Sequence, residues 1–367
     1  MHPATGTLHD GDGEDPSSSG TDWPRRTAVV GPGYMGTGFV QLLALAGLPV
    51  AIGDVSQEAA EAARSRAIEG AGAFALAGMM PSDAADRVAR HTVAAASIGD
   101  ASTGADVIFE AVPESPALKA SVLASIEAAA PTGALIATNT SAIPIAELSA
   151  PLTHPDRFLG AHWFNPSQWV PCVELIAGPS TDPAHLETMA ALLERLGKRP
   201  SVVGDGPGFV ANRIQFAMFK EAATIVEEGV ATAEVIDEVV RASFGFRLPF
   251  FGPFTIADMA GLDVYAGAYG SLEAGLGSRM AVPEAVATRV AEGRLGMKTG
   301  GGFLELDGAD AAAMASWRDE AYVAMERLLG DLGPWDAKST SAASPPPSDA
   351  EPAPGAALIP DQTDRPR

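Results

Sequence analysis

The residue types that could carry out acid–base chemistry lie on two short apolar runs in the middle of the chain. His162 falls within Phe158–Phe164, and Glu174 lies twelve positions further on, in Val173–Ala177. A neutral imidazole beside an alcohol can remove the hydroxyl proton while hydride leaves the same carbon, and a carboxylate on the other ring nitrogen stabilises the cation that forms. We therefore predict a His–Glu pair that oxidises a hydroxyl group, provided that the two runs are neighbouring strands. The alternative, on these residues alone, is that His162 is a packed core histidine.

A glycine-rich motif near the N-terminus is typical of a dinucleotide site. Gly31–Gly36 (GPGYMG) follows the apolar run Arg26–Val30 and opens a helical pattern. The first glycine permits a tight turn, the second lets the backbone approach a pyrophosphate, and the third allows close packing of helix on strand. The pyrophosphate would lie at the helix N-terminus, where unpaired N–H groups attract anions. The residues predicted to bind the cofactor here are Gly31, Gly33, Tyr34, Met35 and Gly36.

An acidic residue follows the second apolar run at the distance expected for ribose recognition. Asp54 comes directly after Pro49–Gly53 and 18 residues beyond Gly36, close to the separation of about 20 that is usual in such sites. Its carboxylate is expected to bind the adenosine ribose hydroxyls, and its charge opposes a 2′-phosphate. We therefore predict NAD rather than NADP as the cofactor. The alternative is that Asp54 is a helix N-cap.

The order of the elements that must position these residues predicts the fold class. Between residues 25 and 204, β-like runs alternate with helical patterns, which indicates a parallel, Rossmann-type doubly wound α/β sheet that forms an NAD-binding domain. From 205 to 336 the pattern contains helices only, including one predicted helix over Asp258–Ala274, so we expect an all-α second domain. The segments 1–24 and 337–367 lack periodic bulky apolar residues and are predicted to be disordered.

Composition and charge exclude several classes of function. The 367 residues include 24 basic and 46 acidic ones, for a net charge of −22, so nucleic-acid binding is not expected. The longest apolar stretch, Val40–Ile52, is shorter than the roughly 20 residues that span a membrane, and the acidic N-terminus is unlike a signal or transit peptide. The single cysteine, Cys172, allows neither an intramolecular disulfide nor a cysteine-based metal site. We expect no bound metal and a reducing, cytoplasmic setting.

Six features in order resemble the L-3-hydroxyacyl-CoA dehydrogenase family over roughly residues 26–305. They are Asn139–Ser141 (NTS), Gly160–Pro166 (GAHWFNP), the spacing from His162 to Glu174, Pro207–Arg213 (PGFVANR), Gly252–Asp263 (GPF, then D, then GLD) and Lys298–Phe303 (KTGGGF). The resemblance implies an NAD-dependent enzyme of fatty acid metabolism that converts an (S)-3-hydroxyacyl-CoA into a 3-oxoacyl-CoA. It also implies a homodimer formed through the helical domain, which would bind substrate as well.

The resemblance implies roles for the residues around the reacting carbon. His162 would be the general base and Glu174 its partner. Ser141, which follows the strand-like run Ala134–Thr138, and Asn212 would hydrogen-bond the reacting oxygen. On its residue type alone, Asn212 could instead cap its own helix.

Two charged residues would lie beside the nicotinamide and its ribose. Glu114 and Lys119 match the family's glutamate and lysine at this position. From the residues alone, Lys119 could be an ordinary solvated helix charge. Cys172 is interpreted as a buried bystander, because hydride transfer needs no covalent step.

Departures from the family pattern leave the substrate open. Relatives that act on free acyl-CoA often carry lysines after the second strand, whereas residues 56–90 hold four arginines and no lysine. Arg247 is either a partner for a substrate carboxylate or a surface residue, and Trp163, Gln168 and Trp169 are predicted to add bulk near His162. The alternative substrates are a sugar acid, a carnitine-like molecule or a carrier-bound hydroxyacyl group. A protein that binds NAD without catalysis is disfavoured, because the His–Glu pair and the glycine motif are intact.

Overall fold

The computed structural model describes residues 23–305 and 308–333, which divide into two compact units. The division falls within helix α8 (Ala211–Glu227), between Met218 and Phe219. The predicted disordered segments lie outside the described residues, except for Trp23 and Pro24. These two belong to the folded first unit: Pro24 is buried, and the guanidinium carbon of Arg195 lies 3.7 Å from the centroid of the Trp23 ring.

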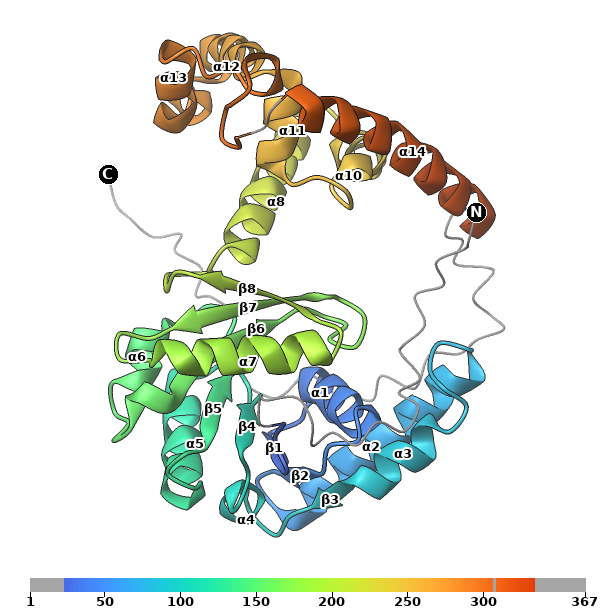
Figure 1. The fold of residues 1–367 in the computed structure, drawn as a ribbon, viewed down its shortest axis with the longest axis vertical. Helices are drawn as coiled ribbons and strands as arrows, with labels where there is room; N and C mark the ends of the chain where they lie inside the picture. Colours follow the sequence, from blue (N-terminus) through green and yellow to red (C-terminus); the bar gives the residue numbers. More distant parts are fainter. Residues whose placement is uncertain (1–22, 306–307, 334–367) are drawn as a thin grey trace, which may run out of the picture. The chain divides into compact units, whose positions relative to one another are not determined.

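The first unit is built on a single eight-stranded sheet (Figure 1). The strands are β1 (Thr27–Val30), β2 (Val50–Gly53), β3 (Thr92–Ala94), β4 (Val107–Glu110), β5 (Leu135–Thr138), β6 (Phe158–Trp163), β7 (Cys172–Ala177) and β8 (Arg199–Val203). Their order is β3-β2-β1-β4-β5-β6-β7-β8, and β3 to β6 run parallel. β7 is antiparallel to β6, and β8 is parallel to β7, so the sheet is mostly parallel and departs from the predicted parallel arrangement between β6 and β7. The connection 164–171 is too short for the crossover of a dozen or so residues that a parallel neighbour requires.

Helices cover both faces of this sheet, as the doubly wound prediction requires. They are α1 (Tyr34–Leu45), α2 (Gln57–Leu76), α3 (Ala84–His91), α4 (Ile98–Ser102), α5 (Pro116–Ala129), α6 (Ile145–Ser149) and α7 (Pro183–Arg195), with a 3₁₀ turn at Pro155–Arg157. Helices α1, α2, α3 and α7 pack against strand residues such as Val29 and Ile52. Helices α4, α5 and α6 pack against the alternate residues, such as Ala28 and Val30. A Rossmann-type sheet with two apolar faces is therefore confirmed.

The second unit contains the remaining helices. They are α9 (Ala233–Ala242), α10 (Phe244–Arg247), α11 (Pro253–Ala260), α12 (Leu262–Leu276), α13 (Glu284–Ala291) and α14 (Gly308–Leu332), with 3₁₀ turns at Ser278–Met280 and Met297–Thr299. The single helix predicted over Asp258–Ala274 is divided between α11 and α12, because Gly261 has a φ of 103° that no helical residue adopts. The buried carboxylate of Asp258 accepts hydrogen bonds from the backbone N–H groups of Phe303 and Leu304, so it ties the KTGGGF motif to α11.

The longest helices carry several charged side chains each. They are α2 and α14, which have 20 and 25 residues. Within the described part of the chain, no helix is both long and apolar enough to cross a membrane.

Candidate active site

His162 and Glu174 meet across two neighbouring strands. They are register partners on the antiparallel strands β6 and β7, so their side chains project from the same face. His162 Nδ1 lies 2.8 Å from Glu174 Oε2, and both side chains are buried. Because a carboxylate can only accept, Nδ1 carries the hydrogen, and Nε2 of the neutral ring is the atom that can take up a proton.

The second oxygen of Glu174 holds the start of helix α8. Oε1 accepts hydrogen bonds from the backbone N–H groups of Val210 and Ala211, at 3.1 and 2.9 Å. The first N–H groups of a helix have no partner within it, so the carboxylate satisfies donors that would otherwise be orphaned. On the same turn, Asn212 Nδ2 donates to the carbonyl oxygen of Ser141 at 3.1 Å. The Asn212 amide therefore contacts a second predicted site residue, Ser141, and does not cap its own helix.

Two aromatic rings lie against the imidazole. The ring centroids of Phe164 and Phe209 are 4.5 and 5.6 Å from that of His162. Phe209 is buried and has a φ of 48°, in the left-handed region that bulky residues rarely adopt. Such a backbone costs about 1–3 kcal/mol and persists only where its surroundings enforce it. Here Phe209 connects two parts of the site. Its ring lies against His162, and the two residues that follow it, at the start of helix α8, donate to Glu174.

The glycine motif forms the turn from β1 into α1, and its geometry fits a dinucleotide. Gly31 has a φ of 67°, and a Cβ atom there would lie 2.3 Å from Val112 Cγ1, so only glycine is accommodated. Gly33 is the N-cap of α1, no side chain caps the helix, and the first turn has no acidic residue. A Cβ atom at Gly33 would meet nothing within 4 Å. The first N–H groups of α1 are therefore open to an anion such as a pyrophosphate.

Asp54 follows β2 at the same edge of the sheet. Its Oδ1 accepts a hydrogen bond from the N–H of Val55 at 2.7 Å, and the residue lines the same cavity as the glycine turn. The N-cap of α2 is Ser56, whose hydroxyl oxygen accepts a backbone N–H at 3.2 Å. The alternative of Asp54 as a helix N-cap is therefore wrong.

A buried ion pair lies behind Glu114. Lys119, on α5, is fully buried, and its Nζ lies 2.9 and 3.1 Å from the two carboxylate oxygens of Glu110 and 3.7 Å from Glu114 Oε2. The alternative of Lys119 as a solvated charge is therefore wrong. Glu110 also accepts hydrogen bonds from the hydroxyl of Thr138 and from Val112 N, the latter at 2.7 Å. A buried charge without a partner destabilises the folded state, so Lys119 and Glu110 each depend on the other for their buried position.

The carboxylate of Glu114 organises the loop that follows β5. Oε1 accepts hydrogen bonds from Thr140 Oγ1 at 2.6 Å, Ser141 N at 2.9 Å and Ala142 N at 3.0 Å. Burial raises the pKa of Glu114, but these hydrogen bonds and the charge of Lys119 outweigh burial and hold the pKa below its ordinary value. The position of Ser141 therefore depends on an ionised Glu114.

A cavity of about 900 Å³ opens at the carboxyl ends of β1, β2, β4, β5 and β6, the edge at which α/β sheets bind ligands. The predicted site residues in its wall are Gly31, Gly33, Tyr34, Met35, Asp54, Glu114, Ser141, His162 and Asn212. Three others lie behind the wall: Gly36 on the face of α1 that packs against Val29 and Ala111, Lys119 behind Glu114, and Glu174 behind His162.

Sequence reasoning misses several residues of this site. Asn139, Asn165 and Gln215 also line the cavity, and Asn139 Oδ1 accepts a hydrogen bond from Trp163 N at 3.0 Å. Glu110 carried a signal that could have been recognised, since it is an acidic residue at the end of an otherwise apolar strand. Asn139 and Asn165 belong to the NTS and GAHWFNP motifs, which could have marked them, whereas nothing in the sequence distinguishes Gln215 from a helix-surface amide.

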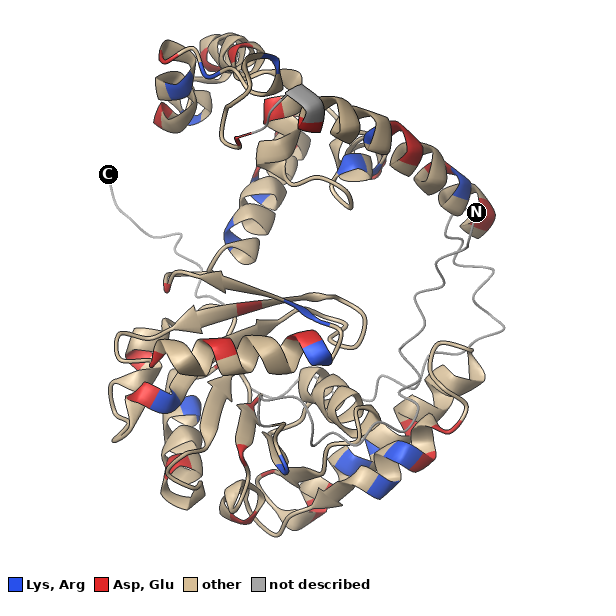
Figure 2. Cartoon of the chain, viewed as in Figure 1, with Lys and Arg blue, Asp and Glu red and all other residues tan. Residues whose placement is uncertain are grey.

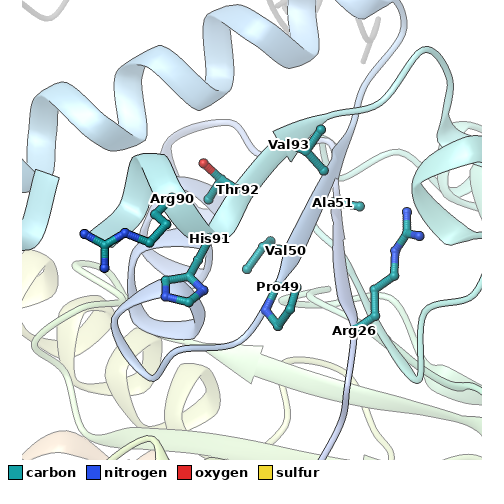
Figure 3. A pocket seen from close by; sticks show the side chains of 8 residues that line it. All are labelled: Arg26, Pro49, Val50, Ala51, Arg90, His91, Thr92 and Val93. Carbon is teal, nitrogen blue, oxygen red and sulfur yellow. The ribbon is translucent and has the colours of Figure 1, made fainter. Parts of the chain in front are cut away.

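A smaller hollow of about 340 Å³ lies at the opposite ends of the strands, near the amino ends of β2 and β3 (Figure 3). Arg26, Arg90 and His91 contribute its polar side chains. Figure 3 shows the guanidinium groups of Arg26 and Arg90 on opposite sides of the hollow, so they do not converge on one point. None of the predicted site residues lies there.

The arginines after the second strand are mostly occupied by the chain itself. The basic positions of α2 and α3 appear in blue in Figure 2. Arg64, Arg66 and Arg87 donate hydrogen bonds to backbone carbonyl groups, and Arg90 is exposed. This region therefore offers few free cations to the phosphates of a coenzyme.

Of the three residues predicted to add bulk near His162, Trp163 lines the same cavity as His162, although its ring packs on the other face of β6. Successive strand residues point to opposite faces, so Trp163 is buried against Phe39, with ring centroids 4.5 Å apart. Gln168 and Trp169 contact side chains of α1 and α2.

Cys172 behaves as a protonated thiol. Burial and the charge of Glu174 raise its pKa, against a hydrogen bond with Ser201 that lowers it. A thiol with a raised pKa is a poor nucleophile, which agrees with the bystander interpretation, although Cys172 is half-buried and not buried as predicted. Within residues 23–305 and 308–333, no group of three or more His, Cys, Asp or Glu is placed to hold a metal ion.

Replacing Glu114 with glutamine should change how stability depends on pH. A carboxyl group whose pKa is lowered by folding stabilises the folded state above its unfolded-state pKa, and this contribution disappears as the pH falls through the folded-state pKa. We expect Glu114→Gln to be less stable than the wild type at neutral pH, and the difference to shrink as the pH falls from about 5 to about 3. Urea unfolding at a series of pH values measures this difference.

The matched control is Glu147→Gln, which changes an exposed carboxylate on α6. Its stability relative to the wild type should vary little with pH. A Glu114→Gln difference that stays constant down to pH 3 would contradict the inferred role of the ionised carboxylate.

The chain matches two family models that together cover most of the described residues. Residues 26–206 match the NAD binding domain of 3-hydroxyacyl-CoA dehydrogenase, and residues 208–306 match its C-terminal domain. The structure is similar to the crystal structure of a 3-hydroxyacyl-CoA dehydrogenase from Archaeoglobus fulgidus, with a TM-score of 0.70 and 29% identity over 83% of this chain and 99% of that one.

Curated relatives differ in the substrates that their names give. The chain is 36% identical over 306 residues to a 5-formyl-3-hydroxy-2-methylpyridine 4-carboxylate 5-dehydrogenase of Mesorhizobium japonicum, covering 83% of this chain and 98% of that protein. It is 34% identical over 284 residues to a probable 3-hydroxybutyryl-CoA dehydrogenase of Bacillus subtilis, covering 77% and 98%. It spans 38% of the length of the fatty acid oxidation complex alpha subunit of Idiomarina loihiensis, to which it is 34% identical.

The family models, the near-full-length relatives and the fold agree on the class of chemistry. The chain belongs to the 3-hydroxyacyl-CoA dehydrogenase family, and it is an NAD-dependent oxidoreductase that acts on a CH–OH group.

Proposed function

We propose that the protein oxidises a secondary hydroxyl group with His162 as the general base and Glu174 as its partner. One observation carries the proposal: the 2.8 Å contact between His162 Nδ1 and Glu174 Oε2 supports a side chain that lines the same cavity as the glycine turn. A positioned base and an anion-binding helix end in one cavity suit hydride transfer to a dinucleotide.

The wall of the cavity suggests how NAD is held. The pyrophosphate would bind at the N-terminus of α1, beside Gly33, Tyr34 and Met35, and Asp54 would bind the adenosine ribose. Glu114 would face the nicotinamide end, with the buried Lys119 acting from behind it. When bound, NAD supplies the acceptor for the hydride that leaves the substrate carbon.

The remaining residues act on the substrate oxygen. Ser141 and Asn212 would hydrogen-bond the hydroxyl and orient it toward His162. Nε2 takes the hydroxyl proton, and the carboxylate of Glu174 stabilises the imidazolium that results. The reverse reduction uses the same groups, with the imidazolium returning the proton to the oxygen.

The first candidate substrate is an (S)-3-hydroxyacyl-CoA, which gives a 3-oxoacyl-CoA and a place in fatty acid metabolism. The support is the match over both family domains and the relative named for 3-hydroxybutyryl-CoA. The second candidate is a small hydroxy acid or a carrier-bound hydroxyacyl group. It is favoured by the internally bonded arginines of α2 and α3 and by the relative named for a pyridine carboxylate.

We assign residues 25–204 to NAD binding and 205–336 to substrate binding and dimerisation. Large apolar side chains on the second unit are exposed in the single chain, among them Phe219, Val230, Val239 and Val264. Exposed apolar surface of this kind is typical of an interface, and a second copy of the chain is the partner that we propose. The single cysteine supports a reducing, cytoplasmic setting.

Removing the imidazole should abolish most of the turnover. His162→Ala is expected to lower kcat at least about 10²–10⁴-fold, which is the usual contribution of a positioned general base. The affinity for NADH should change little, because the glycine turn is untouched. Steady-state kinetics with NADH fluorescence titration measure both, and His154→Ala, an exposed histidine, is the control. Wild-type turnover in folded His162→Ala would refute the assignment.

Removing the carboxylate at Asp54 should alter cofactor choice. Asp54→Ala is expected to raise KM for NAD about 10- to 100-fold, as the loss of hydrogen bonds to a charged group predicts, and to weaken the preference over NADP. Steady-state kinetics with both cofactors test this, with the exposed Asp86→Ala as control. Unchanged kinetics for both cofactors would contradict the ribose role.

A comparison of substrates separates the two candidates. We expect a higher kcat/KM for reduction of acetoacetyl-CoA with NADH than for oxidation of small hydroxy acids with NAD. A higher kcat/KM on a hydroxy acid would replace the first candidate with the second. NADH binding without turnover on any hydroxyl or ketone substrate would contradict catalysis itself.

A further inference from the structure

The connection between β6 and β7, residues 164–171, links the two strands that carry the His–Glu pair. It begins directly after β6 and ends where β7 starts. Asn165 and Val170 of this connection line the cavity. Its conformation therefore affects both the floor of the cavity and the strands that hold the reacting side chains.

The same connection contacts the helix that would bind the cofactor pyrophosphate. Ser167 Oγ donates to the carbonyl oxygen of Met35 at 3.0 Å, within the first turn of α1, and Gln168 Nε2 donates to Gln41 Oε1 at 2.8 Å. The approach is close, because a Cβ atom at Gly38 would lie 2.0 Å from Ser167 Oγ. A side chain at position 38 would therefore collide with the connection in its present conformation.

A buried ammonium group holds this connection from inside. Lys198 Nζ donates to the carbonyl oxygens of Ser167 at 2.6 Å, Gln168 at 3.1 Å and Val170 at 3.0 Å. An ammonium group has three donors, and all three are matched. Among the described residues, no carboxylate lies within ion-pair distance of Lys198. The backbone carbonyl groups compensate its charge, together with the ring of Trp163, whose centroid lies 5.4 Å from Nζ.

Three carbonyl dipoles that converge on one point repel each other unless a cation lies between them. Burial lowers the pKa of Lys198 to about 8, so most of the side chains still carry the charge at neutral pH. Without the ammonium group, the buried carbonyl of Ser167 and the partly buried carbonyls of Gln168 and Val170 would lose the donor that they share. The connection would then have to rearrange, which would move Ser167 away from α1.

We propose that Lys198 is a positioning residue for the cofactor: it holds residues 164–171 in the form that docks on the first turn of α1. The proposal rests on the proposed cofactor site at α1. Lys198 lies outside the motifs named above. It would affect NAD binding indirectly, because it holds Ser167, which in turn contacts Met35 on α1. Lys198 itself touches neither cofactor nor substrate.

The test is the affinity of the purified full chain for NADH, measured by fluorescence titration at pH 7. We expect Lys198→Met to raise the dissociation constant about tenfold, equivalent to about 1.4 kcal/mol, and to raise KM for NAD in parallel. Saturating NAD should restore most of kcat. Lys220→Met, which removes an exposed lysine, should leave the dissociation constant unchanged.

A second pair of variants tests the docking without changing Lys198. Gly38→Ala places a methyl group where Ser167 Oγ lies and should weaken NADH binding to a similar extent. Gly72→Ala, where the added Cβ would lie an ordinary 3.6 Å from Ala85 Cβ, should not. If Lys198→Met does not fold, Gly38→Ala decides.

The outcomes are separable. A dissociation constant within twofold of the wild type in folded Lys198→Met, or in Gly38→Ala when the first variant does not fold, overturns the proposal, even if the melting temperature falls. That result would leave Lys198 a purely structural residue. Failure of the wild type to bind NADH would instead contradict the proposed cofactor site.

Discussion

One carboxylate, that of Glu174, holds the centre of the site together. Its two oxygens are divided between an imidazole on the neighbouring strand and the first N–H groups of helix α8. The oxygen toward His162 sets which ring nitrogen carries hydrogen, and the oxygen toward α8 fixes the turn from which Asn212 reaches the Ser141 carbonyl. A single buried carboxylate thus positions the imidazole of His162, its tautomer and the Asn212 amide.

The other side of the cavity depends on a second group of buried charges. Glu110 and Lys119 are fully enclosed by apolar strands and helix α5, and they hold the backbone at Val112 and the side chain of Thr138. Glu114 continues this network into the loop that carries Ser141. Removing one of these partners would leave the charge of another buried and uncompensated, so this part of the cavity wall depends on all of them together.

Much of the architecture could be predicted from sequence because the signals are local. The apolar runs predict the strands, and the glycine motif predicts the turn and the helix that follows it. The twelve positions between His162 and Glu174 in the sequence are compatible with adjacent strands. Relationships that depend on tertiary packing could not be predicted. The reversal of β7, the burial of Lys119 against Glu110, and the lysine that holds residues 164–171 are examples. A lysine or glutamate looks the same in sequence whether it is solvated or buried, so its environment has to be seen.

The register between β6 and β7 has a consequence for how the protein tolerates changes in length. His162 and Glu174 are directly opposite each other in an antiparallel pair, and side chains alternate between faces at every step along a strand. Inserting or deleting one residue in either strand would turn one member of the pair toward helices α1 and α7, while the other stayed at the cavity. The contact between His162 and Glu174 is therefore kept or lost as a whole with the alignment of β6 and β7, whereas the composition of the surrounding cavity wall can change gradually.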